Sequence, residues 1–422
     1  MVALNLAAEM ERLPPEAREI LRMVGSLVEE SRLPSGRLFL VGGVVRDLLL
    51  GCPCLDIDIV GEGDALSLAE AVARRTHGRL VVHKRFGTAT VRLGEFRFDF
   101  AAARSETYSH PGALPEVRSD TLKADLFRRD FTINAMAVDL TVSRWGTLID
   151  YYGGLEDVRK RCIRVLHPGS FVDDATRILR AIRYEQRLGF RMETGTARLL
   201  RRDLKMLDTI SGDRLRHEIE LVLGEERPER ILRRGAELGV LQQLHPSLKG
   251  NGWLALKFPL VRELAGSAKD MPALYLSLLV YHLTPEEGGQ LLDRLKVPGA
   301  IRKVVRDALE IKSEVSRMSS SALAPGALYR WLHLRHPLAI RVNALAGAPM
   351  VRWYLELFLR QLSLVKPLLS GEDLMALGVP AGSEMGRLQE HLREERLEGR
   401  LKTRGDEEAL VKKWIERKSG GC

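Results

Sequence analysis

Short apolar runs of the kind that form β-strands are concentrated between about residues 37 and 145. They predict strands over residues 37–41, 56–60, 79–83, 88–93 and 96–101. Helical spacing of apolar residues separates some of these runs, as it does over residues 65–75. Because the two patterns are interleaved, the sequence predicts a small mixed α/β domain over residues 37–150.

The rest of the chain has the apolar spacing of amphipathic helices. Residues 1–36 predict one helix that ends at the turn Pro34-Ser35-Gly36. After about residue 165 the strand pattern disappears, and helical spacing broken by prolines and glycines continues almost to the end. The predicted fold class is therefore α+β, in which a helical neck (151–225), body (226–365) and tail (366–422) follow the α/β head.

Composition narrows the class of protein. The 422 residues carry 65 Lys and Arg against 56 Asp and Glu, a net charge of +9 that favours a polyanionic partner. Four cysteines are too few for a disulfide framework, so a reducing cytoplasm is expected. The start of the chain lacks a signal-peptide pattern, and the apolar runs are too short to span a bilayer. A monomer and a homodimer both stay open.

Residues 38–60 contain the first pattern that points to chemistry. The strand-like run 38–41 is followed by Gly42-Gly43, where the backbone can turn sharply and approach a ligand with no Cβ in the way. A helix is predicted over residues 44–50, and backbone N–H groups at its start suit phosphate oxygens. Since a glycine pair after a strand is common, its meaning depends on the acids that follow.

Asp56 and Asp58 stand two apart on the next predicted strand, so their carboxylates point to the same face. Two neighbouring carboxylates repel each other, whereas Mg²⁺ favours carboxylates together with substrate phosphates. Asp99, on the strand 96–101, is either a third acid that holds a metal or acts as a base, or an ordinary strand residue. Phosphates beside two carboxylates indicate nucleotidyl transfer with two metals.

The sequence GGVVRD followed by DIDIV resembles the first motif of the DNA polymerase β-like nucleotidyltransferase superfamily. Within that superfamily it resembles the class II tRNA nucleotidyltransferases and bacterial poly(A) polymerases. The resemblance rests on motifs between residues 37 and about 220, and on layout beyond them. It implies Mg²⁺ as cofactor, with CTP, ATP and tRNA as substrates. Asp56 and Asp58 would hold two Mg²⁺ ions, while Gly42, Gly43 and Arg46 would seat the triphosphate.

A dense polar octet at residues 128–135 follows. Its guanidinium groups suit triphosphate oxygens, and Asp130 and Asn134, one helical turn apart, could hydrogen-bond a ribose. The octet resembles the family's ribose-selecting motif, which implies that Arg129, Asp130 and Asn134 hold the ribose. Residues 105–122 predict a long loop, where the resembled family has a flexible loop that helps the enzyme change from adding C to adding A.

A second candidate site lies in the segment 171–183, whose apolar positions 175, 178, 179 and 182 predict a buried helical stripe. Asp174 and Arg177, three apart, could mimic a complementary base, because Arg only donates and ionised Asp only accepts. Cytosine and adenine offer an amino donor beside a ring acceptor, whereas uracil and guanine present an oxygen to the Asp. A helix cap and a surface ion pair are the plain alternative.

The same segment resembles the family's protein-template motif Glu-Asp-x-x-Arg, with Asp173 in place of the Glu. Arg180 and Arg183 are candidates for triphosphate or backbone contacts, or plain surface charges. In the tail, a glycine-punctuated helical hairpin precedes basic residues suited to an RNA backbone, among them Arg387, Arg396 and Arg400. That layout looks like the tail of class II tRNA nucleotidyltransferases, which clasps the tRNA elbow, although a solvated helix is the alternative.

Together these patterns predict a template-independent tRNA nucleotidyltransferase that adds or completes the 3′-terminal CCA from CTP and ATP and releases pyrophosphate. An A-adding enzyme, which adds only the terminal A to a tRNA ending in CC, would share every motif. A poly(A) polymerase is less expected, because the chain lacks a long basic C-terminal extension. A non-catalytic RNA-binding module fits the basic charge, but intact Asp56 and Asp58 argue against it.

Overall fold

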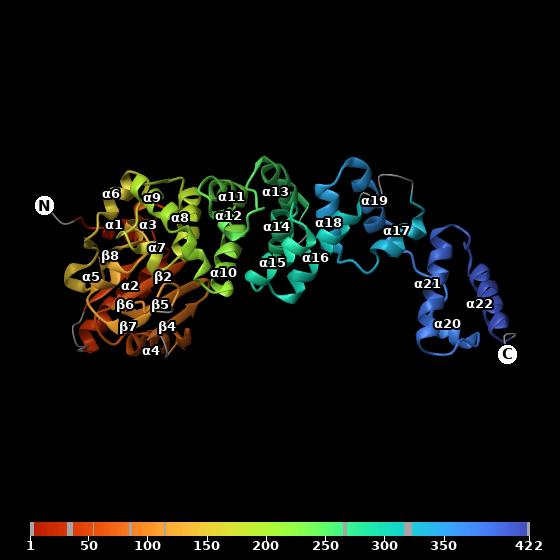
Figure 1. Cartoon of the computed structure of the whole chain (residues 1–422). Helices are drawn as coiled ribbons and strands as arrows, with labels where there is room; N and C mark the ends of the chain where they lie inside the picture. Colours follow the sequence, from red (N-terminus) through yellow and green to blue (C-terminus); the bar gives the residue numbers. More distant parts are fainter. Residues whose placement is uncertain are drawn as a thin grey trace. The chain divides into compact units, whose positions relative to one another are not determined.

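The computed structural model describes residues 4–31, 37–53, 55–83, 87–113, 115–264, 268–315 and 323–419. Two compact units make up the chain: Met1–Glu225 with Arg234–Gln243, and Glu226–Arg233 with Leu244–Cys422. In Figure 1 the first unit is coloured from red to green and the second from green to blue. All described strands belong to the first unit, so the predicted α+β class is confirmed.

A seven-stranded sheet forms the centre of the first unit, with the order β3-β4-β5-β2-β1-β8-β9 (Figure 1). Its strands are β1 (Leu38–Val41), β2 (Asp56–Gly61), β3 (Arg79–His83), β4 (Thr88–Leu93), β5 (Phe96–Ala102), β8 (Met136–Asp139) and β9 (Leu148–Asp150). Strand β2 pairs antiparallel with β1 and parallel with β5. The predicted strands are confirmed, with ends that shift by no more than one residue.

Sequence patterns missed several strands. Strand β8 is buried along its whole length, so its residues do not alternate between apolar and polar. The segment predicted as a long loop contains β6 (Arg104–Thr107) and β7 (Glu116–Ser119), which pair as an antiparallel hairpin, so the loop prediction is wrong for these residues. Two-residue strands β10 (Cys162–Ile163) and β11 (Arg191–Met192) pair in the neck.

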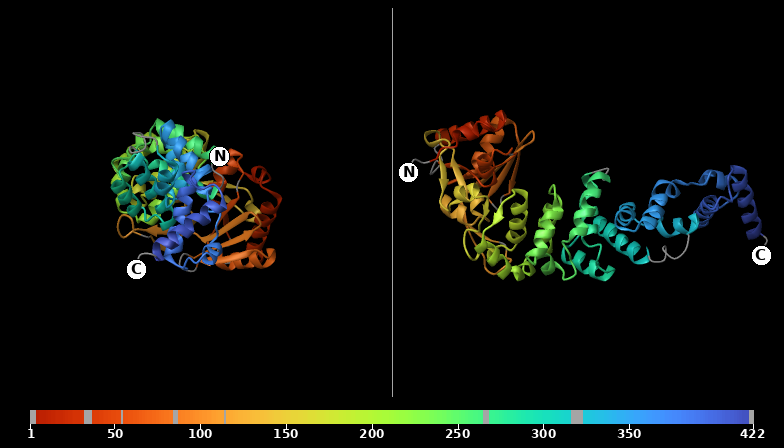
Figure 2. Two further views of the ribbon diagram at one scale, coloured as in Figure 1. Left: turned by 90° about the vertical axis from the view of Figure 1, so that its right-hand side faces the viewer. Right: turned by 90° about the horizontal axis from the view of Figure 1, so that it is seen from above.

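At the N-terminal end the chain forms two helices, so the prediction of one continuous helix is wrong. These helices are α1 (Ala7–Met10) and α2 (Pro15–Ser31). The new helix begins at Pro15, directly after Pro14, because proline lacks an N–H and is accommodated in a helix only at its first turn. Helix α2 packs against α4 (Ala65–Thr76), which covers β3, β4 and β5 (Figure 2). The predicted turn at residues 34–36 lies outside the described residues.

Helix α8 (Thr176–Arg187) confirms the predicted buried stripe of the neck. Ala175, just before it, and Ile178, Leu179 and Ile182 within it are all buried. The other helices described in the first unit are α3 (Gly43–Leu50), α5 (Leu122–Phe127), α6 (Gly154–Arg159), α7 (Ser170–Asp173), α9 (Thr194–Arg202), α10 (Gly212–Leu223) and α12 (Val240–Leu244). Helix α11 (Pro228–Glu237) contains a boundary between the units.

In its described residues the second unit is helical wherever it has regular secondary structure. Its helices are α13 (Gly252–Leu264), α14 (Met271–Leu279), α15 (Pro285–Arg294), α16 (Gly299–Glu314), α17 (Pro325–Leu332), α18 (Pro337–Ala346), α19 (Pro349–Arg360), α20 (Gly371–Ala376), α21 (Ser383–Leu397) and α22 (Arg404–Ser419). The last three share an apolar core that includes Leu374, Leu388, Leu392 and Val411. Among the described residues no helix is long and apolar enough to cross a membrane.

Candidate active site

A cavity of about 630 Å³ opens in the first unit, with a wall made largely of arginine and acidic side chains. Strand β2, the start of α3, the polar octet and α8 all contribute to it. Eleven of the predicted site residues line this wall: Gly42, Gly43, Arg46, Asp56, Asp58, Arg129, Asp130, Asn134, Asp174, Arg177 and Arg180. Segments far apart in the sequence therefore meet around a single space.

Gly42 is a position where only glycine fits. Its φ of +81° lies in the left-handed region, which strains residues that have a Cβ. A Cβ there would also come within 2.9 Å of Arg129 Nη1 and 3.1 Å of Asp58 Oδ2. Because Gly42 directly precedes α3, the chain brings backbone N–H groups, a guanidinium and a carboxylate close together at the edge of the cavity.

The sheet register brings the candidate acids together. Asp56 and Asp58 both line the cavity, and Asp58 lies opposite Asp99 on the parallel neighbour β5. Asp99 is not on the cavity wall; it accepts a hydrogen bond from Thr90 at 2.5 Å and pairs with Arg97 at 2.8 Å. The structure thus makes Asp99 a neighbour of the acid pair and satisfies its carboxylate elsewhere.

Electrostatics at Asp58 fit a cation site. Burial raises the pKa of Asp58, and repulsion from Asp99 and Asp56 adds to this, although Arg129 attracts the carboxylate. Among the described residues no group of three or more His, Cys, Asp or Glu side chains is placed to hold a metal ion. Two carboxylates with excess negative charge fit a hard divalent ion that takes its other ligands from water and phosphate.

An ion pair with Asp125 fixes the Arg129 side chain near Asp58. Arg129 Nη2 pairs at 3.0 Å with Asp125, whose other oxygen pairs with Arg128 at 2.7 Å. Burial opposes ionisation of Asp125, but attraction by Arg129 and Arg128 outweighs it and lowers the pKa of this carboxyl. The Arg129 guanidinium is therefore fixed as a cation beside Gly42.

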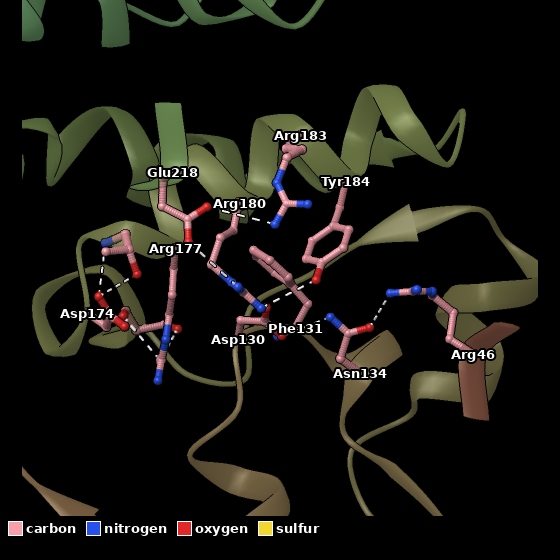
Figure 3. Close-up of polar contacts among 12 residues, drawn as sticks. Arg46, Asp130, Phe131, Asn134, Asp174, Arg177, Arg180, Arg183, Tyr184 and Glu218 are labelled. Atoms are coloured by element: carbon pink, nitrogen blue, oxygen red, sulfur yellow. Dashed lines mark hydrogen bonds and ion pairs between the residues drawn. The ribbon is translucent and has the colours of Figure 1, made fainter. Parts of the chain in front are cut away.

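Asp130 and Asn134 belong to a buried chain of hydrogen bonds (Figure 3). Asn134 Nδ2 donates to Asp130 Oδ1 at 2.9 Å, and Arg46 Nη1 donates to Asn134 Oδ1 at 2.6 Å. Arg180 Nε and Nη2 both donate to Asp130 Oδ2, at 2.9 and 2.7 Å. Burial disfavours the charged form of Asp130, but Arg180 and Asn134 outweigh it and lower the pKa.

The local backbone around this pair differs from the prediction. Asp130 and Asn134 do not lie on one turn of an α-helix, because Phe131 is extended and residues Thr132–Asn134 form a 3₁₀ turn. The two side chains still meet, through the hydrogen bond just described. Their proximity is confirmed, while the helical reason for it is wrong.

Asp174 and Arg177 both line the cavity, as their spacing suggested. Asp174 precedes α8 in an extended conformation and accepts from Thr176 N at 3.0 Å and Arg214 Nη2 at 2.8 Å. Arg177 is buried; its Nη2 donates to the Arg128 carbonyl at 2.6 Å, and its Nη1 donates to Ser170 Oγ at 2.8 Å. Neither group makes the surface ion pair that was the plain alternative for this spacing.

Arg183 takes a different place from the other candidates. It is buried, it pairs with Glu225 at 3.3 Å and with Glu218 at 3.8 Å, and it is not one of the residues that line the cavity. Burial raises the pKa of Glu218 above its usual value, although Arg180 and Arg183 oppose this. In this structure Arg183 links α8 to Glu218 of α10 and to Glu225. Direct contact between Arg183 and the nucleotide stays a prediction.

Several wall residues escaped the sequence analysis. Glu106 and Tyr108 come from the hairpin that was predicted as a loop, and the Tyr108 hydroxyl donates to Glu106 at 2.9 Å. Tyr184 and Arg187 lie on α8, beyond the recognised motif. The four residues of β6 are all polar, so they lack the alternation of apolar and polar residues that predicts a strand. Arg180 and Tyr184, in contrast, are four residues apart on a predicted helix, and this spacing could have placed Tyr184 on the same helix face as Arg180.

The predicted tail residues belong to the second unit and differ in their surroundings. Arg396 pairs with the buried Glu407 at 3.1 Å, and Arg400 pairs with Glu395 at 2.5 Å. Arg387 is exposed, and no ion pair is recorded for it within the described residues. Of the three, Arg387 is thus the most available to an outside partner.

Comparisons with known proteins identify the family of this chain. Residues 38–164 match the poly A polymerase head domain family, and residues 189–250 match the family described as a probable RNA and SrmB-binding site of polymerase A. An A-adding tRNA nucleotidyltransferase from Halalkalibacterium halodurans is 33% identical over 386 residues, which cover 86% of this chain and 84% of that protein. The chain belongs to the class II tRNA nucleotidyltransferase family. The predicted resemblance is confirmed.

Two further tRNA nucleotidyltransferases show how far the likeness extends. The A-adding enzyme of Geobacter sulfurreducens is 36% identical over 419 residues, covering 94% of this chain and 47% of that protein. The chain thus spans about half the length of this relative. The structure of the Thermotoga maritima CCA-adding enzyme complexed with tRNA_CCA is 32% identical, with a TM-score of 0.76, and the match covers 98% of this chain and all of that one.

Proposed function

We propose that this chain transfers nucleotides from CTP or ATP to the 3′ end of tRNA and so adds or completes the terminal CCA. One observation carries the proposal: a carboxylate pair, a glycine turn with an arginine, and an Asp–Arg pair before and on α8 line one cavity. These three groups would hold metal, triphosphate and base. The proposed tRNA substrate also favours a location in the cytoplasm.

In the proposed reaction the 3′-hydroxyl of the RNA attacks the α-phosphorus of the nucleotide. The hydroxyl loses its proton to solvent as the new phosphorus–oxygen bond forms. The bond from the α-phosphorus to the oxygen that bridges to the β-phosphate breaks, and pyrophosphate leaves with that oxygen and its electron pair. Asp56 and Asp58 would hold divalent cations, for which Mg²⁺ is the proposed ion, and these supply charge neutralisation and activation of the hydroxyl when bound.

Residues of the chain would do the positioning. Backbone N–H groups after Gly42 and the Arg129 guanidinium would bind the triphosphate, because both present donors at the cavity edge. This proposal moves Arg129 from the ribose, where its motif placed it, to the triphosphate, and moves Arg46 from the triphosphate to the support of Asn134. Asp130 and Asn134 would receive the ribose hydroxyls, since both line the wall and their orientation is fixed by Arg180 and Arg46. Fixed donors and acceptors favour one pose of the nucleotide.

Base choice would rest on Asp174 and Arg177. The Asp accepts from the amino group of cytosine or adenine, and the Arg donates to the neighbouring ring acceptor. Uracil and guanine place an oxygen opposite the Asp and leave polar groups unpaired, at a cost of roughly 1–3 kcal/mol. Contacts with Arg214 and Ser170 would hold the two side chains in one orientation.

Addition of the terminal A alone is the second candidate function. The observation in its favour is that relatives similar over most of this chain, from Geobacter and Halalkalibacterium, are named A-adding tRNA nucleotidyltransferases. The motifs on the cavity wall do not separate the two activities, because both need the same chemistry at the α-phosphorus.

Three tRNA transcripts, ending before CCA, after C and after CC, would test both candidates. Each is incubated with the purified chain, Mg²⁺ and labelled CTP, ATP or both, with an Asp56→Ala variant as the matched control. Completion of all three transcripts supports full CCA addition. Incorporation of a single A into the CC-ended transcript alone supports the A-adding activity. No incorporation in any transcript, with an active reference enzyme alongside, would contradict the proposed function.

A further inference from the structure

Tyr184 lies on α8 with its ring surrounded by guanidinium groups (Figure 3). The Cζ atoms of Arg183, Arg46 and Arg180 lie 5.0, 5.3 and 5.6 Å from the ring centroid. Phe131 meets the ring edge-on, with centroids 5.9 Å apart at an angle of 84°. Tyr184, Arg46 and Arg180 all line the cavity proposed for the nucleotide.

Three guanidinium groups around one ring repel one another, so their arrangement requires attraction to the ring and neutralisation by nearby acids. The negative face of an aromatic ring attracts guanidinium groups within about 6 Å. Nearby acids balance the charges: Asp47 and Asp130 pair with Arg46 and Arg180 at 2.8 and 2.7 Å. The ring therefore keeps the arginines apart and in place, where a smaller side chain would leave room for them to move.

Each of two arginines at the ring anchors one half of the proposed ribose site. Arg46 donates to Asn134, and Arg180 donates through two nitrogens to Asp130. Both arginines come from elements other than the octet, and the ring of Tyr184 lies within about 6 Å of both guanidinium groups. Their shared contact couples α3 and α8 to the two groups that would face the sugar.

We propose that Tyr184 is a positioning residue for ribose selection: its ring holds Arg46 and Arg180 so that Asn134 and Asp130 present fixed groups to the sugar. This inference rests on the proposed function. The aromatic face matters more than the hydroxyl. The hydroxyl oxygen lies 3.4 Å from Arg180 Nη2, which makes a long and therefore weak hydrogen bond. Phenylalanine is therefore expected to replace tyrosine here, while leucine is not.

The test compares ATP with 2′-deoxy-ATP on the CC-ended transcript for wild type, Tyr184→Phe and Tyr184→Leu. In Tyr184→Leu we expect the ratio of kcat/KM for ATP over 2′-deoxy-ATP to fall about tenfold, since loosened ribose contacts favour ATP less. In Tyr184→Phe the ratio should stay within about threefold of wild type, because the ring remains. Equilibrium competition between the two nucleotides, measured without RNA, should show the same order.

A preparation that is partly unfolded loses activity with ATP and with 2′-deoxy-ATP by the same factor. The ratio of the two kcat/KM values therefore separates an effect on positioning from an effect on folding. Thermal melting checks that Tyr184→Leu is folded; Tyr184→Met, which also lacks the ring and suits a helix, serves if it is not. An unchanged ratio in a folded ringless variant overturns the inference while wild type remains active. An inactive wild type that also binds neither nucleotide contradicts the proposed function instead.

Discussion

Asp58 and Asp99 lie directly opposite each other on the parallel strands β2 and β5, yet only Asp58 lines the cavity. The side chain of Asp99 is bound by Thr90 and Arg97. The two adjacent carboxylates therefore have different surroundings: burial raises the pKa of Asp58, and repulsion from Asp99 and Asp56 adds to this, although Arg129 attracts the carboxylate.

Asp58→Asn is therefore expected to separate activity from stability. Nucleotide incorporation should fall at least about 100-fold, because a neutral amide is a poor ligand for a divalent cation. The melting temperature at pH 7 should stay the same or rise, since burial and repulsion disfavour the charged carboxylate in the folded state. Incorporation assays with calorimetry on the same preparation would measure both quantities.

Asp99→Asn provides the matched control on the opposite strand. We expect a smaller loss of incorporation than for Asp58→Asn, together with a lower melting temperature, because the contacts to Thr90 and Arg97 are weakened. Equal loss of activity in the two variants, with both folded, would show that Asp99 takes part in the chemistry and would contradict its assignment as a neighbour.

Asp174→Asn should alter base choice more than rate. The amide of Asn presents a donor where Asp presents only acceptors, so it can pair with the O4 of uracil. Incorporation of UTP relative to CTP or ATP should rise about tenfold, the size of one improved polar contact. Competition assays with all four nucleotides on the three transcripts would measure this ratio.

Arg214→Gln tests the support behind Asp174. Arg214 Nη2 donates to Asp174 at 2.8 Å, so its loss frees the carboxylate without changing its hydrogen-bonding type. We expect weaker discrimination among all bases, with no specific gain for UTP. If Arg214→Gln reproduced the UTP preference of Asp174→Asn, the hydrogen-bonding code assigned to Asp174 would be wrong.

The sequence predicted local features well because they depend on residues close together in the chain. Asp56 and Asp58 are two apart, and the pleat alone places them on one face. The links between Arg46 and Asn134, and between Arg180 and Asp130, join residues 88 and 50 positions apart and have no local signature. Sequence could name these residues as candidates, but only the fold shows that they hold one another.

The sequence analysis missed strands that are buried on both faces or exposed on both faces, because their residues do not alternate between apolar and polar. Strand β8 is buried throughout and reads as a plain apolar run, while β7 is exposed throughout and carries polar residues on both faces. In both cases the two-residue period that identifies a half-buried strand is absent. Tyr108 was missed as well, because it follows β6 of the same hairpin, whose four residues are all polar and show no alternation with apolar ones.

Asp125 predicts an acid-sensitive contribution to stability. Its folded-state pKa is lowered because Arg129 and Arg128 outweigh the effect of burial. A lowered pKa contributes stability that is fully present above the unfolded-state pKa, about 4, and is lost as the pH falls through the folded-state value. Wild type should therefore exceed Asp125→Asn in unfolding free energy by roughly 2–4 kcal/mol at pH 7, and by much less near pH 3.

Urea unfolding at a series of pH values would measure this difference. Glu70→Gln is the matched control, because Glu70 forms only an exposed pair with Arg74 at 3.8 Å, and the change should shift stability by less than about 0.5 kcal/mol at any pH. A difference between wild type and Asp125→Asn that does not depend on pH would show that the carboxylate charge is not what stabilises this part of the head.

Arg387 and Arg396 should respond differently to removal of their charge. Arg387 is exposed, so Arg387→Ala is expected to weaken tRNA binding several-fold, to reduce the salt dependence by about one ion and to leave the melting temperature unchanged. Arg396 pairs with the buried Glu407, which also accepts from the backbone of Leu368 and Leu369. Arg396→Ala should therefore lower the melting temperature.

Filter binding of tRNA at two salt concentrations, with melting curves of the same variants, separates these effects. Binding and salt dependence that stay at wild-type values in Arg387→Ala would remove this residue from the RNA contact. If Arg396→Ala weakened binding in a tail that melted normally, Arg396 would act on RNA directly, and its pair with Glu407 would have to open when tRNA binds.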